Sequence, residues 1–379
     1  MRIVYPLLWS RPDRKACRQQ TMGTVAALAR RGHEVTLLMP RGERDSAFHA
    51  DELRAYFQVE GQFELLQRPS PWAGDALVRT LLWLRQVFHD PALLAADILY
   101  SRIPAMFGVG SLSPVPFATD HYRPWPDDLP AARSFIRRTS RHRNCLGLIL
   151  HSAYAASAYE RAGVDPARIL VAHNGVETSS NGVPTRGAAR ARLGLPADRA
   201  VAVYAGRLNA EKGLDQVFAL AERRPDVLFL LVGSEGEGPI EVEARSRANV
   251  QIVPWQPPED LPIWLAAADL LLVPASREPL EKYRNCVMPL KLISYLAAGR
   301  PILAPEAPDT AELLIHRHNA MLVPSGDPAA GVVAIDAILN EQNLARSIGE
   351  AARLTASGLT WDRRAEKIEG FLVSRSGST

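Results

Sequence analysis

The stretch VAVYAGRLNAEKGLDQ, residues 201–216, joins a predicted strand to a predicted helix through a turn that contains glycine. The apolar run at 201–205 is typical of a strand that is covered on both faces of its sheet. Gly206 permits a sharp turn of the backbone where Arg207 emerges. The Lys-Gly step at 212–213 then precedes apolar residues at helical spacing. A strand that passes into a helix in this way predicts an α/β fold.

Two cations beside this helix start indicate an anion-binding turn. A helix N-terminus presents unpaired amide groups and the positive end of the helix dipole. Arg207 and Lys212 would add positive charge at this point, which suits a diphosphate. Such turns are common in α/β proteins, so the alternative is that both side chains are ordinary solvated charges in a loop.

The length of the chain, 379 residues, predicts two domains because one ordinary core rarely grows so large. No segment approaches the ~20 consecutive apolar residues that span a bilayer, and the start MRIVYPLL lacks the build of a signal peptide. We therefore expect a cytoplasmic protein. Cys17, Cys145 and Cys286 have neither zinc-ligand nor disulfide-framework spacing, and we expect them to be buried apolar residues.

The net charge of +3 is unevenly distributed along the chain. The first 176 residues contain 22 Lys+Arg and 16 Asp+Glu, so the first half is basic and the remainder is acidic. A basic surface can attract anionic lipid, nucleic acid or phosphorylated substrates. Nucleic-acid binding is not expected, because the basic residues are not interleaved with aromatic residues.

Short apolar runs alternate with helical patterns throughout the chain, which predicts parallel sheets with helices between the strands. In the first half the strand candidates are residues 3–8, 34–39, 63–67, 98–101, 116–119, 147–151 and 169–172. In the second half they are residues 201–205, 227–232, 250–253, 270–274, 302–304 and 321–323. The loop Gly233–Gly238 follows one of these strands, where glycines would let backbone amides approach a ligand.

These patterns predict two doubly wound, Rossmann-like domains, at 1–176 and 200–359. The Pro/Gly/Arg-rich segment 177–199 has no clear period and is expected to be a linker. A final helical pattern begins at Trp361, so residues 360–379 are expected to form a C-terminal helix and tail. Doubly wound sheets bind ligands at the carboxyl ends of their strands, which predicts a site in a central cleft that the domains face.

Further motifs accompany the turn in a fixed order. They are HNGVE at 173–177, YAGRL with EKG at 204–213, WLAAAD leading to VPAS at 264–276, LAAGRPI at 296–302, and the stretch 312–328 that ends in LVPSGDP. In this order the chain resembles the retaining GT-B glycosyltransferases of the fourth sequence family, over most of its length. The resemblance implies a GT-B fold whose C-terminal helix crosses back to the first domain. It also implies a nucleotide-sugar donor bound without a metal or another cofactor.

The resemblance assigns roles to several residues of this chain. Arg207 and Lys212 would hold the charge that develops on the leaving diphosphate. Gly206 and Gly233 would lie against the donor. His121, at the end of the strand pattern PFATDH, resembles the histidine that faces the donor sugar in relatives, although a lone histidine can equally be structural. Transfer in this family involves no protein nucleophile, so none is expected.

The chain departs from the family where two motif glutamates are expected. Cys286 and Ser294 occupy these positions. A serine can still bond one ribose hydroxyl without a full charge. Glu278, Glu281 and Lys291 lie nearby in the sequence and are candidates for the same donor-binding tasks. An acidic pair at 127–128 is expected to cap a helix and not to bind a metal.

The first loop, residues 9–20, departs from the family as well. Relatives often have a glycine pair there, whereas this chain has Arg11, Arg14, Lys15 and Arg18. We therefore expect an acceptor side specialised for an anionic substrate. The acceptor itself is expected to be a glycan, a lipid-linked molecule or a small molecule.

Two segments raise the further possibility that the protein associates peripherally with the inner face of a membrane. Residues 72–95 are rich in leucine, and residues 133–143 hold five arginines. Apolar and basic surfaces together suit anionic lipid. The alternative is a core helix and a solvated basic face.

We expect a hexosyl-type, retaining glycosyltransferase that acts in glycoconjugate or polysaccharide synthesis. One alternative is a catalytically silent relative that binds or regulates another transferase, since both motif glutamates are absent. Another is a nucleotide-sugar epimerase, which would need a base for proton abstraction, and only His121 is an obvious candidate.

Overall fold

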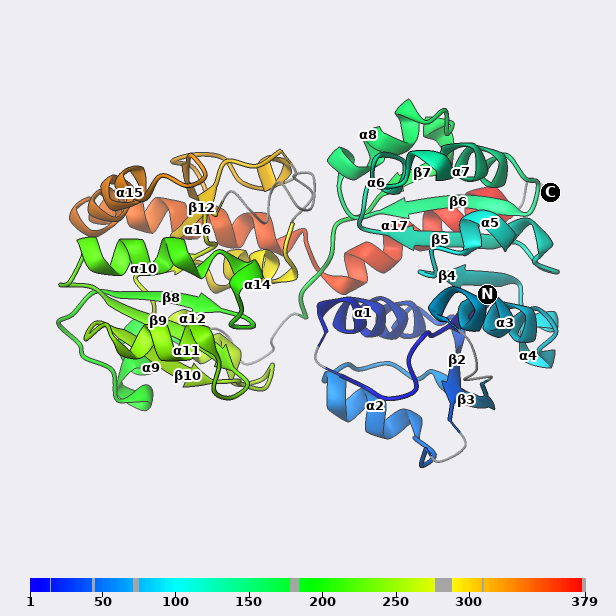
Figure 1. Ribbon diagram of the computed structural model, residues 1–379, viewed down its shortest axis with the longest axis horizontal. Coiled ribbons are helices and arrows are strands. Elements are labelled where there is room, and N and C mark those ends of the chain that lie inside the picture. The colour runs from blue at the N-terminus through cyan, green and yellow to red at the C-terminus, as the bar shows by residue number, and fades with distance from the viewer. Residues whose placement is uncertain are drawn as a thin grey trace. The chain divides into compact units, whose positions relative to one another are not determined.

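The computed structural model describes residues 1–13, 15–42, 45–70, 75–177, 184–276, 288–308 and 310–376 (Figure 1). The chain divides into two compact units. Unit 1 consists of Met1–Glu177 together with Thr360–Thr379, and unit 2 consists of Thr178–Leu359. The C-terminal segment therefore belongs to the same unit as the N-terminus. Glu278, Glu281, Cys286 and Arg14 lie outside the described residues.

Unit 1 is built on a parallel sheet with the strand order β3-β2-β1-β4-β5-β6-β7. The chain adds strands outward from β1 to β3 and then returns to place β4 beside β1. This reversal creates a switch point, where doubly wound sheets bind their ligands. The strands are β1 Arg2–Pro6, β2 Glu34–Arg41, β3 Glu64–Pro69, β4 Ile98–Ser101, β5 Phe117–His121, β6 Cys145–Leu150 and β7 Ile169–Val171.

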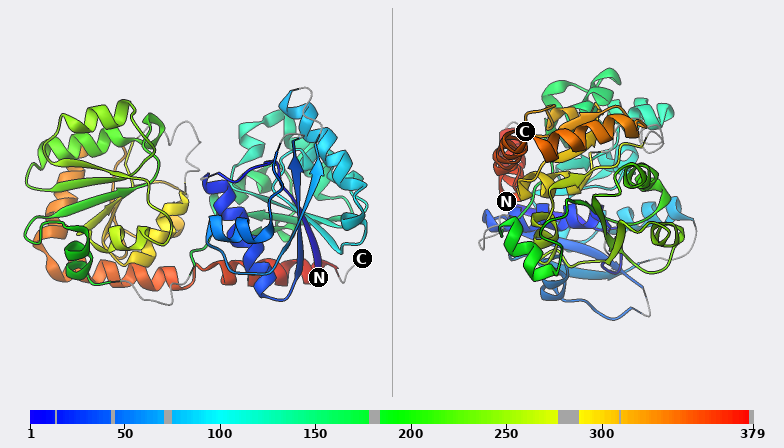
Figure 2. Two further views of the ribbon diagram at one scale, coloured as in Figure 1. Left: turned by 90° about the horizontal axis from the view of Figure 1, so that it is seen from below. Right: turned by 90° about the vertical axis from the view of Figure 1, so that its left-hand side faces the viewer.

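Helices cover both faces of this sheet (Figure 2). They are α1 Ala16–Arg30, α2 Ala50–Phe57, α3 Ala76–Phe88, α4 Pro91–Leu94, α5 Met106–Val109, α6 Trp125–Asp128, α7 Arg133–Ser140, α8 Ala153–Arg161 and α17 Trp361–Ser376. Strands β4, β5 and β6 are buried along their whole length. The mainly apolar sequences of β4 and β6 predict this burial, whereas β5 buries the polar residues Asp120 and His121 at its end.

Unit 2 repeats this plan with a parallel sheet of order β10-β9-β8-β11-β12-β13, so its switch point lies between β8 and β11. The strands are β8 Val201–Ala205, β9 Leu228–Ser234, β10 Val250–Pro254, β11 Leu270–Leu272, β12 Ile302–Pro305 and β13 Met321–Val323. The helices are α9 Arg186–Leu193, α10 Leu214–Arg223, α11 Pro239–Arg245, α12 Leu261–Ala266, α14 Leu290–Ala298, α15 Pro328–Asn340 and α16 Gln342–Ser357. The predicted fold class of two doubly wound parallel sheets is confirmed.

The segment expected to be a linker differs from the prediction. Residues 186–193 form α9, which begins after the capping residue Thr185 and ends at Gly194 in the left-handed conformation. Alanine and arginine are strong helix formers, and the glycine and proline that suggested a linker fall mostly outside these eight residues. Helix α9 packs in unit 2 against α12 through Ala189.

Helix α17 completes unit 1 by packing on α1. Gly23 of α1 has no room for a side chain, because a Cβ there would lie 2.4 Å from the Trp361 ring. A parallel bridge between Val176 and Thr360 joins the end of the first segment to the start of α17. No helix in the described parts of the chain has both the length and the apolar character needed to cross a bilayer.

Candidate functional site

The turn after β8 in unit 2 is shaped by two glycines with positive φ angles. Gly206 has a φ of 142°, and a Cβ there would lie 2.7 Å from Nζ of Lys291. A Cβ on Gly233, at the end of neighbouring β9, would lie 2.4 Å from the carbonyl oxygen of Gly206. A side chain at Gly233 would therefore clash with the backbone of the turn, and both glycines have φ angles that other residues rarely adopt. This close approach keeps the backbone exposed to a ligand above it.

Arg207 and Lys212 are exposed on the turn between β8 and α10. Gly213 then starts α10 with a φ of 68°, and no side chain caps the first turn of the helix. A Cβ on Gly213 would lie 2.3 Å from Cβ of Ser276, so the segment after β11 closes the base of the turn. Uncapped amides therefore lie next to two exposed cations at the turn where the sequence predicts anion binding.

Lys291 reaches the same turn from the first residues of α14. Its ammonium group lies 3.7 Å from the centroid of the Tyr204 ring, a cation–π contact at the end of β8. Burial and, second, the charge of Lys212 lower the pKa of Lys291 well below its usual value. Lys291 has no hydrogen bond or ion pair within the described chain, so no carboxylate there neutralises it. The turn thus gathers three basic side chains, Arg207, Lys212 and Lys291.

The strand end under this turn is held by Tyr295 of α14. Its hydroxyl accepts a hydrogen bond from the amide of Ala205 at 2.7 Å and lies 3.4 Å from the carbonyl oxygen of the same residue. Ser294 precedes it and is partly buried, one helical turn after Lys291. Ser294, which stands where relatives have the second motif glutamate, therefore lies on the same helix as Lys291.

The glycine loop after β9 is fixed by a buried carboxylate. Ser234 Oγ lies 2.8 Å from Oε1 of Glu241 and 2.9 Å from the carbonyl oxygen of Gly236. Glu241 itself is buried. Sequence reasoning did not single out Glu241, because an acidic residue in the first turn of a helix is ordinary.

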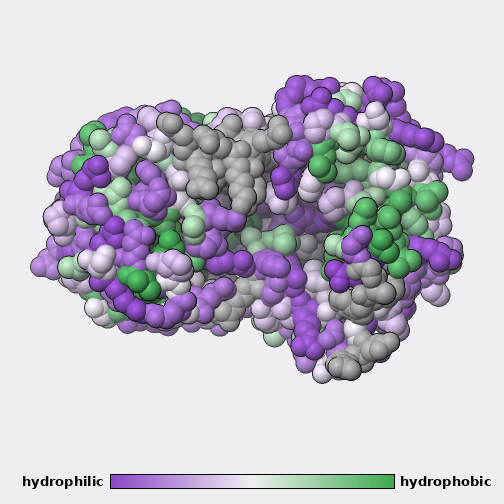
Figure 3. All heavy atoms as spheres, in the orientation of Figure 1, coloured by the Kyte–Doolittle hydropathy of each residue, from purple (hydrophilic) through white to green (hydrophobic). Residues whose placement is uncertain are grey.

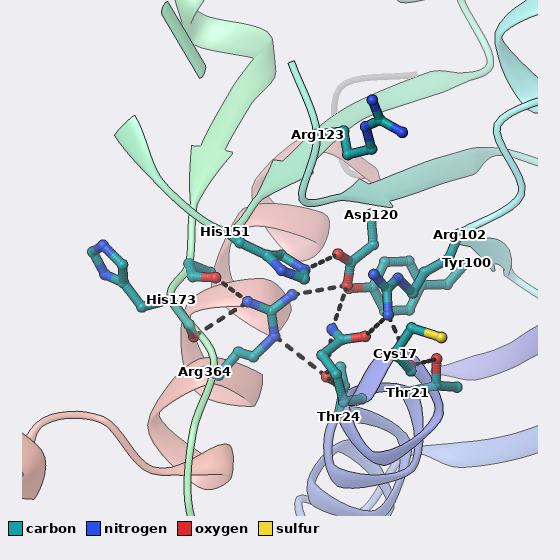
Figure 4. A network of polar contacts seen from close by, with 12 residues as sticks. Cys17, Thr21, Thr24, Tyr100, Arg102, Asp120, Arg123, His151, His173 and Arg364 are labelled. Atoms are coloured by element: carbon teal, nitrogen blue, oxygen red, sulfur yellow. Dashed lines mark hydrogen bonds and ion pairs between the residues drawn. The ribbon is translucent and has the colours of Figure 1, made fainter. Parts of the chain in front are cut away.

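A second polar cluster, the Asp120 network, fills the centre of unit 1 (Figure 4). Asp120 is buried near the end of β5 and accepts hydrogen bonds from Tyr100 Oη at 2.7 Å, His151 Nε2 at 2.8 Å and Arg364 Nη2 at 2.8 Å. Burial opposes its charge, but Arg364 and His151 outweigh burial and hold the pKa of the carboxyl well below its usual range. The carboxyl group of Asp120 therefore stays negatively charged at neutral pH.

Arg364 of α17 connects this carboxylate to the chain crossover. Its guanidinium donates to the carbonyl oxygens of Ala172 and, at 3.2 Å, of His173, and its Nε donates to Thr24 Oγ1 at 3.3 Å. Figure 4 shows the side chain lying between these carbonyls and Asp120. One buried cation thus joins α17, α1, β5 and the HNGVE turn.

His121 follows Asp120 and ends β5. Its ring is buried, with its centroid 4.5 Å from that of Phe107, and its Nε2 has no hydrogen-bond partner among the described residues. Burial lowers the pKa of His121 to about 3, so the imidazole is neutral across the physiological range. A neutral ring can donate one hydrogen bond and accept another, but it lacks the imidazolium proton that a general acid would give.

The first loop of unit 1 is less cationic than its sequence suggests. Arg11 pairs with Asp45 at 2.7 Å, and Asp13 pairs with Lys15 at 3.4 Å and with Arg18 at 3.0 Å. Acidic residues of the same region therefore neutralise part of the charge that predicted an anionic acceptor.

Arg102 is a cation that the sequence reasoning missed at this edge. It directly follows β4 at the switch point, and its guanidinium donates to the carbonyl oxygen of Cys17 at 2.9 Å and to Gln20 Oε1 (Figure 4). Cys17 is exposed, which corrects the expectation that it is buried, because it lies on the solvent side of the first turn of α1. Cys145 is buried as expected.

The acidic pair at 127–128 differs from its expected role as a cap. Both residues lie inside the short helix α6. Asp127 pairs with Arg133 and Arg161, and Asp128 pairs with Arg123. Both carboxylates are therefore held by ion pairs with arginines and not by the amides at a helix start. No group of three or more metal-ligating side chains gathers in the described ranges.

The pattern of the family described as Glycosyl transferases group 1 matches residues 185–355, and that of Glycosyltransferase Family 4 matches residues 20–180. The two matches fall in different units and together span most of the chain. The chain belongs to the family 4 glycosyltransferases.

Curated relatives of this family 4 member include the D-inositol 3-phosphate glycosyltransferases of Jonesia denitrificans and Streptomyces scabiei. They are 28% and 30% identical to this chain over 235 and 255 residues. The alignments cover 57% and 62% of this chain and 52% and 55% of the relatives. The chain therefore matches about half the length of these curated relatives.

Solved structures share the whole fold. Anabaena Alr3699/HepE in complex with UDP-glucose has a TM-score of 0.71 at 19% identity, covering 99% of this chain and 100% of that chain. Sucrose-phosphate synthase from Thermosynechococcus elongatus has a TM-score of 0.76 at 19% identity, covering 100% of this chain and 99% of that chain. At these identities the likeness shows the fold alone, which is GT-B.

Proposed function

We propose that this family 4 member is a glycosyltransferase that takes a sugar from a nucleoside diphosphate donor bound at the β8–α10 turn. The observation that carries the proposal is the ammonium group of Lys291, which lies at the turn without a hydrogen-bond or ion-pair partner among the described residues. Burial lowers the pKa of this group in the free protein, and an anion beside it would favour its charged form. A donor diphosphate would supply that anion. The complexes of HepE with UDP-glucose and with UDP support a nucleotide-sugar donor.

The chemistry of this donor site follows from its charges. As the bond between the sugar and the diphosphate breaks, negative charge grows on the leaving phosphate, and Arg207, Lys212 and Lys291 stabilise it. Gly206 and Gly233 let backbone amides approach the same group. Ser294 contributes one hydroxyl toward the ribose. Glu278 and Glu281 remain proposed donor-binding residues outside the described part of the chain.

Transfer in our proposal retains the configuration of a hexosyl group and uses no protein nucleophile. The leaving phosphate takes the proton of the acceptor hydroxyl on the same face of the sugar. His121 binds a sugar hydroxyl as a neutral imidazole, because its pKa of about 3 keeps it uncharged at neutral pH. A neutral histidine in this role orients the donor without adding a charge that would compete for the diphosphate.

The proposed acceptor carries a hydroxyl group and belongs to a glycan, a lipid-linked molecule or a small molecule. Arg102 lies at the switch point of unit 1, near the loop of Arg11 and Lys15. Arginine at a site of this kind favours an anionic group, such as phosphate. The names of the curated relatives, which act on D-inositol 3-phosphate, support a phosphate-bearing acceptor.

The test is a transfer assay with a panel of nucleotide sugars and acceptors, including inositol 3-phosphate. We expect nucleoside diphosphate release that requires the acceptor, and a product whose anomeric configuration by NMR matches that of the donor. Inverted product would refute retention. Acceptor-independent release with an altered sugar would favour the epimerase, and donor binding without any turnover would favour the silent relative.

We further propose that unit 1 associates with the surface of an anionic membrane. Helix α3 buries Trp83 and Phe88 but exposes Leu77, Leu81 and Leu82, so only part of its apolar surface belongs to the core. Figure 3 shows hydrophobic surface gathered over this region. Exposed residues in and near α7 include Phe135, Arg137, Arg138, Arg141 and Arg143.

An exposed aromatic ring among arginines suits the headgroup region of anionic lipid, where the ring inserts and the cations meet phosphates. The test is sedimentation with vesicles that contain anionic lipid. The chain should co-sediment, and Arg137→Glu/Arg138→Glu/Arg141→Glu should abolish the binding. Uncharged vesicles provide the control. Unchanged sedimentation of the triple variant would contradict the proposal.

A further inference from the structure

A cluster of arginines surrounds one carboxylate at the amino ends of β8, β11 and β12 in unit 2. Asp269 directly precedes β11, and Arg300 precedes β12 by one proline. These strands are neighbours, and the amide of Leu271 donates to the carbonyl oxygen of Pro301 at 2.8 Å. The cluster therefore lies at the opposite edge of the sheet from the Gly206 turn.

Asp269 is fully occupied by other partners. One oxygen accepts from Arg186, and the other accepts from Arg190 Nη2 at 2.5 Å and from the amide of Val201 at 2.7 Å. Arg190 is buried and also donates to the carbonyl oxygens of Ala267 and three residues of the following loop. This part of the cluster has a structural role, because it fixes the start of β8 and α9.

Two further guanidinium groups are left without a partner. Arg300 is partly buried, its Nε is shielded from solvent, and neither it nor Arg353 has a hydrogen bond or ion pair within the described ranges. Arg353 of α16 lies over the end of α14, because a Cβ on Gly299 would be 2.6 Å from its Nε. The exposed guanidinium of Arg353 thus lies beside the Gly299–Arg300 step, close enough for its charge to act on Arg300.

The electrostatics of the cluster are unbalanced. Burial, followed by the charge of Arg186, lowers the pKa of Arg300, and Arg353 and Arg190 add to the effect. The carboxylate of Asp269 opposes them but does not compensate. Arg247 offers a contrast in the same unit, since its Nε is also unpartnered but its terminal nitrogens pair with Glu222 and Glu243. The partnerless N–H of Arg300 has no such compensation, and a buried donor of this kind calls for a missing ion or water.

We propose that Arg300 and Arg353 form a second anion site of unit 2, which binds a small molecule bearing a phosphate or diphosphate group. Arginine pairs with phosphate oxygens through parallel N–H groups, and a dianion would neutralise the excess charge of the cluster. Arg186, at the exposed rim, adds attraction at longer range. The ligand of this site is separate from the donor at the β8–α10 turn, and the inference does not depend on the proposed function.

The experiment measures the binding of inorganic pyrophosphate by calorimetry in the Arg207→Ala/Lys212→Ala background, where the donor turn has lost two cations. We expect saturable binding there. Addition of Arg300→Gln and Arg353→Gln should weaken it at least about tenfold, since each charged hydrogen bond contributes on that order. Binding should also fall with increasing salt. The proposal would be overturned if the background variant showed no saturable binding, or if Arg300→Gln and Arg353→Gln left the pyrophosphate affinity unchanged.

Matched controls separate a local site from a change in net charge or folding. Arg192→Gln removes one exposed charge from α9 and should leave pyrophosphate binding unchanged. If Arg300→Gln unfolds unit 2, Arg300→Lys keeps the charge but loses the planar fork, and it should weaken binding with an unchanged unfolding temperature. A crystal soaked with tungstate adds an independent readout, because anomalous density beside Arg300 supports the site and its absence there contradicts it.

Discussion

At the scale of single residues, Lys291 gives the donor turn a pH dependence. Burial and Lys212 lower the pKa of its ammonium group in the free protein. A bound diphosphate supplies opposite charge and raises that pKa, so binding takes up a proton. Donor affinity should therefore be highest below the free pKa of Lys291 and fall as the pH rises through it, by at most about tenfold per pH unit.

Calorimetry of UDP binding in buffers of different ionisation enthalpy measures this proton uptake. UDP takes up no proton above the second ionisation of its phosphate, at about pH 6, so uptake at any higher pH of a series reports on the protein. Lys291→Met should abolish the uptake and weaken binding, whereas Lys291→Arg, which stays charged, should bind without uptake. Equal uptake in wild type and Lys291→Met would assign the proton to another group.

The buried histidines of unit 1 make its stability depend on pH. The pKa of His121 is lowered to about 3 and that of His151 to about 4, both mainly by burial. Between about pH 4 and 6.5 the unfolded chain binds protons that the folded chain does not. The free energy of unfolding should therefore decrease as the pH falls through this window, by up to about 1.4 kcal/mol per pH unit for each histidine.

Urea unfolding at a series of pH values measures this slope. The His121→Gln variant should show a shallower dependence, smaller by one proton, because glutamine does not titrate. Asp120 adds to the decrease only near the low end of the window, where its carboxyl begins to protonate in the unfolded chain, and it adds equally in wild type and in His121→Gln. A His121→Gln slope equal to that of wild type would mean that His121 is protonated in the folded state.

Individual residues of the site were predictable from the sequence to different degrees. Arg207 and Lys212 were found because glycines and a strand-to-helix change mark their turn. The role of Arg364 left no local signal, since its partners lie in β5 and in the HNGVE turn, far away in the sequence. The sequence also could not predict that His121 is buried and that its Nε2 has no partner among the described residues, because both depend on tertiary packing.

At the scale of elements, α17 depends on one buried ion pair. Arg364 and Asp120 have side chains that are each 1% exposed, and their charges meet at 2.8 Å. Replacing Arg364 by methionine would leave the carboxylate buried without its main counter-ion. We expect a loss of about 3–5 kcal/mol in the free energy of unfolding, measured with urea.

The neighbouring Arg363 provides the matched control, because it pairs on the surface with Glu366. Arg363→Met should leave the unfolding free energy almost unchanged. Adding Asp120→Asn to Arg364→Met should recover part of the loss, since the orphaned charge is removed. Similar, small effects of Arg363→Met and Arg364→Met would show that the buried pair does not hold α17 in place.

Elements with strong patterns were predicted well, and weak ones were not. The central strands of both units are continuous apolar runs bounded by turn residues, and the structure has strands there. Helix α9 was not predicted, because glycines and prolines in and around this short segment indicated a linker. The helix lies between the capping residue Thr185 and Gly194. Flanking residues that cap a helix were a better signal than its interior composition.

At the scale of the whole molecule, the sequence predicted two similar sheets, and the comparisons place both in one family. The units differ in charge, since the basic excess lies in the first half of the chain. The sequence could not identify the phosphate-bearing ligand that we propose for each unit, because backbone amides and arginines would recognise the phosphate and leave the remainder of the ligand unspecified. The donor turn is the feature on which the proposed activity depends most.

The most direct test of that claim is the thermal stabilisation of the chain by nucleoside diphosphates and their sugars, compared with Arg207→Ala/Lys212→Ala. A ligand at about 100 times its dissociation constant adds about 2.7 kcal/mol to the free energy of unfolding. We predict a shift with one nucleoside diphosphate that disappears in the double variant and persists in Arg192→Gln. No shift with any of these ligands, or an equal shift in the double variant, would contradict a donor site at the β8–α10 turn.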